Sequence, residues 1–482
     1  MIHAYPPEVI REAEAPFLAR GVPLMRRAAH EVAQRARALT CQPYPPTLVL
    51  AGGGNNGGDG IWAGAELAAR GWPVAIYLAA PNANTDAIAA ADTAGATFLT
   101  DLDPATLGRY HLWIDALAGI GLRGAARGSL GALLNKLREN AAITTPIILA
   151  VDTPSGLSET AHHPALPATA TVAMIAPAPA QFTPAGRALV GTLHVAPLDV
   201  PLDPARAGAI MIDEDDIAEL WPIPRQSDHK YTRGVAQIIA GSTTYPGAAL
   251  LTTAACVALS PGMVRYRGEC RTAVTTYLPE VVTVAGRSQA TLIGSGMPTH
   301  LAAAQVSELL TGEGIVIADA GALAALPPPP HRAPLVLTPH AGELARLLQI
   351  TRTEVEADLL AAARRAATTW DAIVVAKGPR TLITAPTGPF YLIQDATAAL
   401  ATAGSGDVLA GAITATLAQF AARGEQGHTL PPLALQVALA VSLHAAAATH
   451  AGGYPLQVRE LPAALSATLR TLTGRAQRTK RE

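Results

Sequence analysis

The sequence is poor in charged and aromatic side chains. Charged residues make up 15% and aromatic residues 4% of the 482 residues, and Lys+Arg 35 against Asp+Glu 37 gives a formal net charge of -2. A disordered chain needs low hydrophobicity and high net charge, so a hydrophobic content of 50% excludes that class. Nucleic-acid-binding proteins normally carry a basic excess, and the near-neutral balance argues against such a partner.

Cysteine is also scarce, and long apolar runs are missing. Cys41, Cys256 and Cys270 are odd in number and widely spaced, which is typical of a reducing cytosol and excludes a disulfide framework. Residues 1–17 lack the apolar core of a signal peptide. The most apolar stretch, 433–448, is too short and too polar for a membrane span and predicts a buried core helix. We therefore expect a cytoplasmic protein without a membrane partner.

Short apolar runs alternate with alanine-rich helical patterns in both halves of the chain. The predicted strands are 48–51, 74–79, 112–116 and 147–151 in the first half, and 235–240, 273–277, 315–318, 335–337 and 373–376 in the second. Helical patterns such as 61–71 and 130–142 lie between the strands of the first half. This alternation is typical of βαβ units and parallel sheets.

The proline-containing stretch 197–224 predicts the connection between two α/β domains, at 1–220 and 225–482. An acidic run at 213–216 within this stretch has the alternative interpretation of a helix start. The two halves show no matched internal repeat, so we expect two different α/β folds.

A glycine-rich loop, AGGGNNGGDG at 51–60, follows the first predicted strand and precedes a helix. Three of its glycines have the GxGxxG spacing that lets a pyrophosphate approach a helix N-terminus, although this pattern alone is weak. A P-loop is excluded, because no Lys-Ser or Lys-Thr follows. A tight turn without a ligand is the alternative, but Asn55, Asn56 and Asp59 place three polar side chains in one loop.

Carboxylates also end two later strands of the first half, at Asp115 and Asp152. Ligands bind at the carboxyl ends of parallel strands, so we expect Asp59, Asp115 and Asp152 to share one rim of the sheet. Each of them could instead cap a helix. Carboxylates without a basic partner indicate a bound cation or a proton-transfer group.

In order and spacing, GGGNNGGDG, DALAGIGLRG and VDTPSGL resemble the NAD(P)H-hydrate epimerase domain over residues 1–200. The resemblance implies a Rossmann-like domain that interconverts the R and S epimers of hydrated NADH and NADPH (NADHX and NADPHX). It implies Asp152 as the acid/base group and a potassium ion on Asn56, Asp115 and Ser155. The residues that it implies for nucleotide binding are Asn55, Asn56, Gly57, Gly58, Asp59, Gly119, Ile120, Gly121, Leu122, Arg123, Gly124, Ala125 and Asp152.

Two positions depart from that family. Arg26 and Arg27 stand where the family usually has an acidic residue, and the alanine-proline run around Ala178 stands where it tends to have lysine. These departures motivate an alternative in which the first half is a nucleotide-sensing or partner-binding module without activity.

A second glycine loop, AGSGDVLAG at 403–411, opens an apolar helix. Its free backbone N–H groups and the positive end of the helix dipole suit a phosphoryl group in transfer. Asp407 is placed to accept a proton from a substrate hydroxyl, whereas a helix-start role explains Asp407 but not the surrounding glycines. The runs KGPRT at 377–381 and TPHAGE at 338–343 each follow a predicted strand, at the same expected rim.

Together with SDHKYTRG, IGSG and ADAGAL, these runs resemble the ADP-dependent NAD(P)H-hydrate dehydratase, a ribokinase-like family, over residues 225–455. The resemblance implies that Asp407 deprotonates the hydrate, that ADP phosphorylates it, and that loss of phosphate restores NAD(P)H, with Mg²⁺ as counterion. The residues that it implies for the hydrate are Ala248, Gly296, His340 and Asp407. Those that it implies for ADP are Lys377, Gly378, Pro379, Arg380, Thr381 and Gly406.

We therefore expect a bifunctional enzyme that repairs hydrated nicotinamide nucleotides. Its partners would be the small molecules NADHX, NADPHX and ADP, with K⁺ in the first half, and we expect a homo-oligomer. The alternative is a small-molecule kinase of the ribokinase superfamily with a non-catalytic nucleotide-binding module, because the GSGD loop alone fits both.

Overall fold

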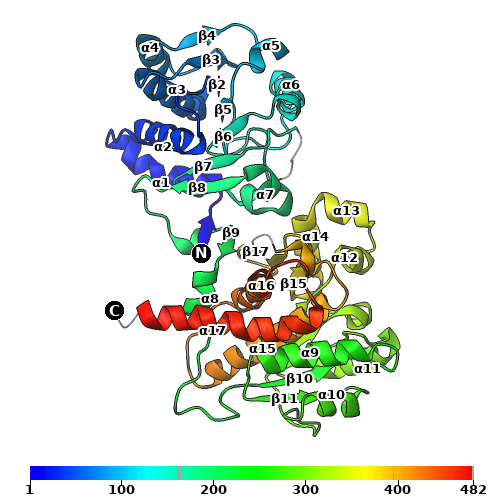
Figure 1. The fold of residues 1–482 in the computed structure, drawn as a ribbon. Coiled ribbons are helices and arrows are strands. Elements are labelled where there is room, and N and C mark those ends of the chain that lie inside the picture. Colours follow the sequence, from blue (N-terminus) through cyan, green and yellow to red (C-terminus); the bar gives the residue numbers. More distant parts are fainter. Residues whose placement is uncertain (160–163, 394–395, 480–482) are drawn as a thin grey trace. The chain divides into compact units, whose positions relative to one another are not determined.

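The computed structural model describes residues 1–159, 164–393 and 396–479 (Figure 1). Residues 160–163, 394–395 and 480–482, which belong to the two domain ranges expected from the sequence, lie outside the described part. The chain divides into two compact units. The N-terminal unit is His3–Ala209, and the C-terminal unit combines Met1–Ile2 with Ile210–Glu482.

Seven strands, all parallel, form the sheet of the N-terminal unit in the order β4-β3-β2-β5-β6-β7-β8. The strands are β2 (Thr47–Ala51), β3 (Val74–Leu78), β4 (Thr97–Leu99), β5 (Leu112–Ala116), β6 (Ile147–Val151), β7 (Ala170–Met174) and β8 (Thr192–Ala196). This is the Rossmann order, and the four strands expected in the first half are confirmed. The chain runs outward in opposite directions from β2 and β5, so the switch point lies between them.

Helices cover both faces of this sheet. The helices of this unit are α1 (Pro7–Ala19), α2 (Leu24–Leu39), α3 (Gly54–Ala69), α4 (Thr85–Thr93), α5 (Pro104–Leu107), α6 (Gly128–Thr144) and α7 (Pro184–Val190), with the 3₁₀ helices η1 (Pro179–Phe182) and η2 (Pro204–Arg206). Successive strand residues point to opposite faces. Accordingly, Val49 and Ile114 pack with α2, α3 and α4, while Leu50 and Trp113 pack with α5 and α6.

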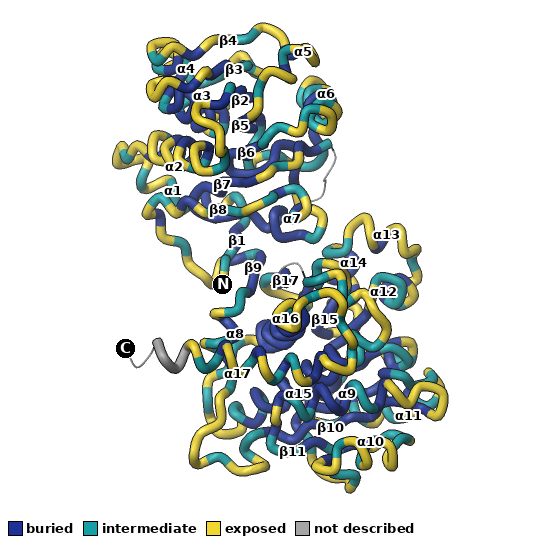
Figure 2. The backbone as a smooth tube through the Cα atoms, viewed as in Figure 1, coloured by how far each residue is buried: buried dark blue, intermediate teal, exposed yellow. Residues whose placement is uncertain are grey.

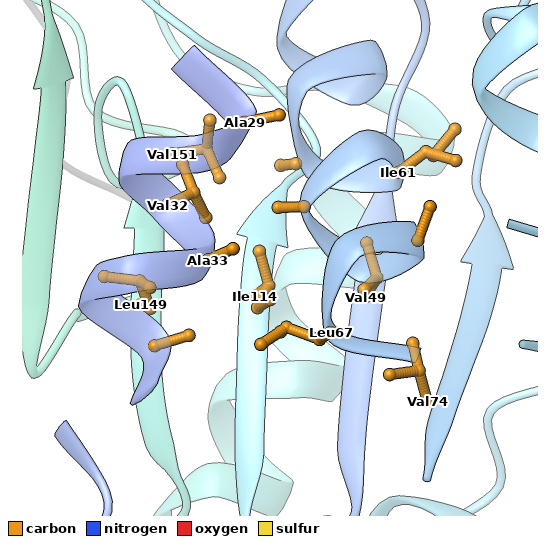
Figure 3. Close-up of a cluster of buried hydrophobic side chains, with 14 of the residues drawn as sticks. Ala29, Val32, Ala33, Val49, Ile61, Leu67, Val74, Ile114, Leu149 and Val151 are labelled. Carbon is orange, nitrogen blue, oxygen red and sulfur yellow. The ribbon is translucent and has the colours of Figure 1, made fainter. Parts of the chain in front are cut away.

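The face covered by α2 and α3 explains why the chain can lack aromatic residues. Figure 3 shows Val32 and Ala33 of α2 beside Ile114, and Leu67 of α3 beside Val49. Alanines at helix positions that face the sheet let the helix axes approach it closely, so aliphatic side chains fill the core without large rings.

Ten strands form the second sheet, in the order β1-β9-β17-β16-β15-β14-β13-β12-β10-β11. They are β1 (Ile2–Ala4), β9 (Ala209–Ile212), β10 (Val235–Ile239), β11 (Met263–Tyr266), β12 (Ala290–Ile293), β13 (Ile315–Ala318), β14 (Leu335–Leu337), β15 (Ala372–Ala376), β16 (Leu382–Thr384) and β17 (Phe390–Ile393). The strands from β11 to β15 are parallel, and β16 pairs antiparallel with both neighbours. The switch point lies between β10 and β12.

The helices of the second unit include long apolar ones. They are α8 (Glu214–Leu220), α9 (Pro246–Ala258), α10 (Arg271–Tyr277), α11 (Thr299–Leu310), α12 (Ala341–Leu348), α13 (Arg352–Ala357), α14 (Leu359–Trp370), α15 (Ser405–Glu425), α16 (Leu433–His450) and α17 (Leu461–Thr479), with the 3₁₀ helices η3 (Ala320–Ala325), η4 (Ala398–Leu400) and η5 (Val458–Glu460). Within the described residues, only α16 is long and apolar enough to cross a membrane. It is buried over most of its length (Figure 2), as expected of a core helix.

Two expectations from the sequence are wrong. Residues 273–277 form part of α10 rather than a strand, because the β-branched residues there bury only Val274, where α10 packs on α9. The stretch 197–224 is not merely a connection, since it contains β9 and α8. Asp213 and Asp216 form the capping box of α8, so the alternative of an acidic helix start is confirmed. Residues 210–220 consequently lie in the second unit.

We predict that Ile114→Ala destabilises the N-terminal unit by about 2–5 kcal/mol, the usual cost of deleting a fully buried aliphatic side chain. Ile114 is 0% exposed in the middle of β5. Hydrogen exchange of the β2, β5 and β6 amides measures the effect locally. Ile143→Ala is the control, because Ile143 is 81% exposed, and equal protection in the two variants would contradict the assigned core.

Candidate functional site

The first candidate site lies at the switch point of the N-terminal sheet, where the glycine loop meets the end of β5. The Gly52 N–H donates to the Ala116 carbonyl at 2.9 Å. A Cβ at Gly52 would lie 1.9 Å from the Leu117 carbonyl oxygen, and one at Gly57 would lie 2.0 Å from the Gly52 oxygen. Only glycine fits at these two positions, one before α3 and one in its first turn, so the backbone can pack closely there.

Asp115 and Ser155 form a buried pair beside this loop. The Ser155 hydroxyl donates to Asp115 Oδ1 at 2.6 Å, and the Ser155 N–H donates to Oδ2 at 2.9 Å. Burial raises the pKa of Asp115 to about 6, although the hydrogen bonds from Ser155 and Leu117 oppose the rise. The Ser155 hydroxyl also accepts from the Ala118 N–H at 2.8 Å, which ties this pair to Gly119.

Asn56 and Asp152 converge on the other side of Gly119. A Cβ at Gly119 would lie 2.7 Å from Asp152 Oδ2 and 3.2 Å from Asn56 Oδ1. Both amide atoms of Asn56 are buried, and neither has a hydrogen-bond partner among the described residues. An unpartnered buried oxygen is costly, and it offers a ligand of the kind that a hard cation takes. The proposed potassium ligands therefore lie around one short loop.

Asp152 is held in place by its backbone and its neighbours. Its φ of 68° is in the left-handed region, and its Oδ2 accepts from the Ile120 N–H at 3.0 Å. Its carbonyl accepts from Gln181 Nε2 at 2.7 Å. Burial raises the pKa of Asp152 to about 6, hydrogen bonds from the Ile120 and Met174 backbone oppose the rise, and Glu14 adds to it. This carboxyl group can therefore both take up and release a proton near neutral pH.

Asp59 and Glu14 complete a group of carboxyls around Asp152. Burial raises the pKa of Asp59 well above its usual range, and Asp152 and Glu14 raise it further. In the described part of the chain, no hydrogen bond or ion pair holds the Asp59 carboxyl. The sequence analysis missed Glu14 and Gln181, because helices α1 and η1 bring them to the site from outside the three motifs.

A cavity of about 290 Å³ lies against the loop 119–125. It is lined by Pro7, Glu8, Arg11, Ile120, Leu122, Arg123, Gly124, Thr153, Leu157, Ser158, Glu159, Ala178 and Ala180. Four of the thirteen residues implied for the nucleotide are among these, whereas the other nine are not: Asn55, Asn56, Gly57, Gly58, Asp59, Gly119, Gly121, Ala125 and Asp152. Gly58 packs instead toward Met25 of α2, where an added Cβ would lie 2.9 Å from Sδ.

The second candidate site lies at the carboxyl ends of β12 to β15, around Asp319. Asp319 Oδ1 accepts from Lys377 Nζ at 3.0 Å and from the Thr338 hydroxyl at 2.7 Å, and Oδ2 accepts from the Ser295 hydroxyl at 2.7 Å. Burial would raise the pKa of Asp319, but Lys377 and the two hydroxyls bring it below its usual range. Burial would lower the pKa of Lys377, but Asp319 and Glu343 raise it overall.

Asp407 lies in the first turn of α15, next to this group. Burial raises the pKa of Asp407 to about 6, Asp319 adds to the rise, and Lys377 opposes it. A Cβ at Gly406 would lie 3.5 Å from Lys377 Nζ, and Gly404 has a φ of 92°. The glycine turn therefore places Asp407 beside a cation and leaves the backbone N–H groups at the start of α15 accessible.

Ala248 and Gly296 meet at the β10–β12 switch point. A Cβ at Gly296 would lie 2.5 Å from Ala248 Cβ, and the Ser242 hydroxyl donates to the Gly296 carbonyl at 2.9 Å. Tyr245, which the sequence analysis missed, stands beside them and is 62% exposed. An exposed aromatic ring at a switch point offers a stacking surface to a flat ligand.

His340 caps α12, and its ring is 57% exposed. Its Nδ1 accepts from the Gly342 and Glu343 N–H groups at 3.0 and 3.3 Å, while Glu343 Oε2 accepts from the His340 N–H at 2.9 Å. Lys377 N–H donates to the Pro339 carbonyl at 2.9 Å, which brings this cap beside the loop Gly378–Thr381 between β15 and β16. Within the described ranges, no group of three or more His, Cys, Asp or Glu side chains is placed to hold a metal ion.

Comparisons with known proteins cover both units. The family described as NAD(P)H-hydrate dehydratase matches residues 236–469, and that of the YjeF-related protein N-terminus matches 22–180. A bifunctional NAD(P)H-hydrate repair enzyme of Mycobacterium tuberculosis is 37% identical over 448 residues, 88% of this chain and 91% of that protein. The chain belongs to the family of bifunctional NAD(P)H-hydrate repair enzymes.

Other relatives resemble the whole chain or one half. A repair enzyme of Corynebacterium glutamicum is 31% identical over 88% of this chain and 89% of its own length. An NAD(P)H-hydrate epimerase of Microbacterium testaceum is 38% identical over 47% of this chain and 90% of that protein. The crystal structure of an ADP/ATP-dependent NAD(P)H-hydrate dehydratase from Bacillus subtilis covers 54% of this chain and 97% of its own, at 28% identity and a TM-score of 0.49. The two family resemblances seen in the sequence are confirmed by the family matches and the whole-chain relatives.

We predict that Asp319→Asn lowers the pKa of Asp407, because a negative neighbour is removed while Lys377 remains. Carboxyl ¹³C NMR titration of aspartate-labelled protein measures the shift, and Asp407→Asn identifies the signal by removing it. Asp371→Asn, at the exposed end of α14, is the control. An unchanged Asp407 titration in Asp319→Asn would show that the two carboxyls do not interact.

Proposed function

We propose that the N-terminal unit interconverts the R and S epimers of NADHX and NADPHX, and that the C-terminal unit dehydrates the S epimer with ADP, giving NAD(P)H, AMP and phosphate. Membership of the repair family supports the pair of reactions. The observation that carries the proposal is that each glycine loop lies beside a carboxyl with a pKa of about 6, the buried Asp152 or the partly buried Asp407. Such a group can accept a proton at neutral pH.

In the C-terminal unit, Asp407 accepts the proton of the hydrate's hydroxyl as its oxygen attacks the β-phosphorus of ADP, and AMP leaves. Lys377 and the first N–H groups of α15 lie where charge develops on the transferring phosphoryl group. The C–O bond then breaks, phosphate departs, and the neighbouring carbon loses a proton, so the ring double bond is restored. Ala248, Gly296 and His340 would contact the hydrate, and Lys377–Thr381 with Gly406 would contact ADP.

Magnesium would reduce the negative charge of the ADP phosphates when bound. It would arrive with the nucleotide, because no cluster of three acidic or other metal-binding side chains occurs among the residues that the structure describes. The Bacillus subtilis dehydratase was itself co-crystallised with ATP and Mg²⁺.

In the N-terminal unit, Asp152 would move a proton as the C–O bond or the ring opens at the hydroxyl-bearing carbon and then closes again, so that the configuration of this carbon is lost and regained. The cavity beside the loop 119–125 would take the nucleotide. Potassium would be held by Asn56, Asp115 and Ser155, and the unpartnered amide oxygen of Asn56 fits such an ion. A cation there supplies positive charge that the surrounding carboxyls lack.

The alternative of a ribokinase-type small-molecule kinase is disfavoured, because relatives that match 88% of the chain are repair enzymes. The alternative of an inactive N-terminal module, the expected homo-oligomer and the cytoplasmic location stay predictions.

Asp407→Asn is predicted to lower the rate of ADP-dependent recovery of NADH absorbance from S-NADHX by about 10²–10⁴-fold, which is the usual contribution of a general base. In the wild type the rate should fall as the pH drops through about 6, because Asp407 must be unprotonated to accept the proton. Epimer exchange without ADP, followed by NMR, should stay normal. Near-normal dehydration by the variant would reduce Asp407 to a helix-start residue.

Asp152→Asn is predicted to impair epimerisation and to leave dehydration of the S epimer unchanged. The variant should convert pure S epimer with ADP at the wild-type rate, since that chemistry lies at Asp407. With mixed epimers it should stop after the S fraction is used, leaving the R epimer to convert only spontaneously. Completion of the mixture at the wild-type rate would make Asp152 a structural residue, and the epimerase assignment would lose its catalytic group.

Replacing potassium by sodium or lithium is predicted to slow epimerisation and to leave S-specific dehydration unchanged. Asn56→Ala should remove this dependence, because it deletes the unpartnered amide oxygen. NMR measurement of epimer exchange in the three chlorides checks both statements. Equal rates in all three salts would remove potassium from the proposal.

A further inference from the structure

Asp152 lies at the centre of a three-residue turn that is uncommon for a residue with a side chain. The Thr153 N–H donates to the Val151 carbonyl at 2.8 Å, and the φ of Asp152 is 68°. This i→i+2 hydrogen bond around a residue with positive φ is typical of a γ-turn of the rare and strained kind. Such strain persists only where the surrounding structure enforces it. The groups that hold this turn therefore also position the Asp152 carboxyl.

The side chain of Gln181 is one of these groups. Its Nε2 donates to the Asp152 carbonyl at 2.7 Å, and Gln181 is 0% exposed in η1. A carbonyl oxygen only accepts, so the atom that faces it is the amide nitrogen. The amide oxygen is buried and has no hydrogen-bond partner among the described residues. Burial of a half-satisfied amide is costly, so packing alone does not explain a glutamine at this position.

The contact between η1 and α7 fixes the place from which this amide reaches the turn. The hydroxyl of Thr183, the N-cap of α7, donates to the Ala180 carbonyl at 3.0 Å and accepts from the Gly186 N–H at 3.0 Å. A Cβ at Gly186 would lie 1.9 Å from the Ala180 carbonyl oxygen, so glycine is required for this close approach. The alanine-proline run around Ala178 leads directly into η1. The segment that departs from the epimerase family thus brings a polar group to the turn.

The Asp152 carboxyl has its own contact, separate from that of its carbonyl. Oδ2 accepts from the Ile120 N–H at 3.0 Å, and a Cβ at Gly119 would lie 2.7 Å from the same oxygen. Because the backbone at 119–120 is this close, a rearranged turn would move the carboxyl away from the Ile120 N–H. Gln181 is not among the residues that line the cavity beside the loop 119–125, so its contact is with the turn and not with the nucleotide.

We propose that Gln181 is a positioning residue of the epimerase site, whose Nε2–H holds the γ-turn at Asp152 so that the carboxyl stays beside the Ile120 N–H. It acts through the Asp152 carbonyl and does not touch substrate. This inference rests on the epimerase function proposed above, and it adds a residue that lies outside the three sequence motifs of the N-terminal unit.

Two substitutions separate this role from simple packing. Gln181→Met keeps the length of the side chain without a donor, and it should lower kcat for exchange of the R and S epimers by about 10- to 100-fold, as misplacement of a reacting group by about 1 Å does. KM for NADHX should be unchanged, because Gln181 acts on Asp152 and not on the nucleotide. Gln181→His, whose Nε2–H can reach the position of the amide nitrogen, should recover most of the lost kcat.

Thr47→Val is the matched control, because Thr47 is also 0% exposed and its hydroxyl also donates to a backbone carbonyl, that of Pro45, at 2.9 Å. Thr47 begins β2, whereas Asp152 follows the last residue of β6, so the two bonds lie at opposite ends of the parallel sheet. Thr47→Val should exchange the epimers at the wild-type rate, even where its free energy of unfolding falls as much as that of Gln181→Met. ADP-dependent dehydration of the S epimer should be the same in all variants as in the wild type.

Wild-type kcat in Gln181→Met, equal losses in Gln181→Met and Gln181→His, or an equal loss in Thr47→Val would overturn the positioning role. A higher KM with unchanged kcat would make Gln181 a binding residue and overturn the role as well. If Gln181→Met fails to fold, Gln181→Asn, whose amide is one methylene short of the carbonyl, is compared with Gln181→His, and equal kcat in these two contradicts the role. Absence of epimer exchange in the wild type would instead contradict the proposed function.

Discussion

A partly buried ion pair between Asp319 and Lys377 organises the C-terminal site. Two charges taken out of water are costly, and this pair is tolerated because the Ser295 and Thr338 hydroxyls satisfy the remaining lone pairs of Asp319. The pair joins the ends of β13 and β15, and its two charges act on Asp407 in opposite directions. Because Lys377 is already neutralised by Asp319, burial prevails at Asp407, and the pKa of that carboxyl stays high enough for it to serve as a base.

The N-terminal site has the same crowding of carboxyls, but within the described residues no ion pair joins a lysine or arginine to Asp59, Asp115 or Asp152, and Arg11 acts on Glu14 alone. Asp59, Asp115 and Asp152 are buried with raised pKa values, and Glu14 adds further negative charge. A bound cation would compensate the negative charge of these groups, as Lys377 compensates that of Asp319. Oxygen ligands without a neighbouring positive side chain favour a bound cation. The same arrangement therefore explains the unpartnered amide of Asn56 and the requirement for potassium that we propose.

Features that are set by residues close together in the sequence could be predicted, whereas features that are set by tertiary packing could not. Buried parallel strands appear as short apolar runs, so eight of the nine expected strands are confirmed, and carboxylates placed directly after strands met at common rims. Residues 273–277 were misjudged because β-branched composition favours a strand, whereas packing on α9 favours a helix. Glu14 and Gln181 could not be found in the same way, because tertiary packing alone brings them to motifs far away in the sequence.

Because charged residues are scarce in this chain, the few that lie in its interior indicate functional sites. A chain with 15% charged residues could bury none of them, yet Asp59, Asp115, Asp152 and Asp319 are buried at the two sites, and Lys377 is mostly buried beside Asp319. Each such group costs desolvation energy that a purely structural core would avoid. Each glycine loop also gives up side-chain packing, at Gly52 and Gly57 in one unit and at Gly404 and Gly406 in the other, so that backbone can reach these acids or a ligand. The desolvated charges and the lost side-chain packing therefore occur at the same two sheet edges. This is the pattern expected of functional sites, where features that lower stability are retained because the chemistry requires them.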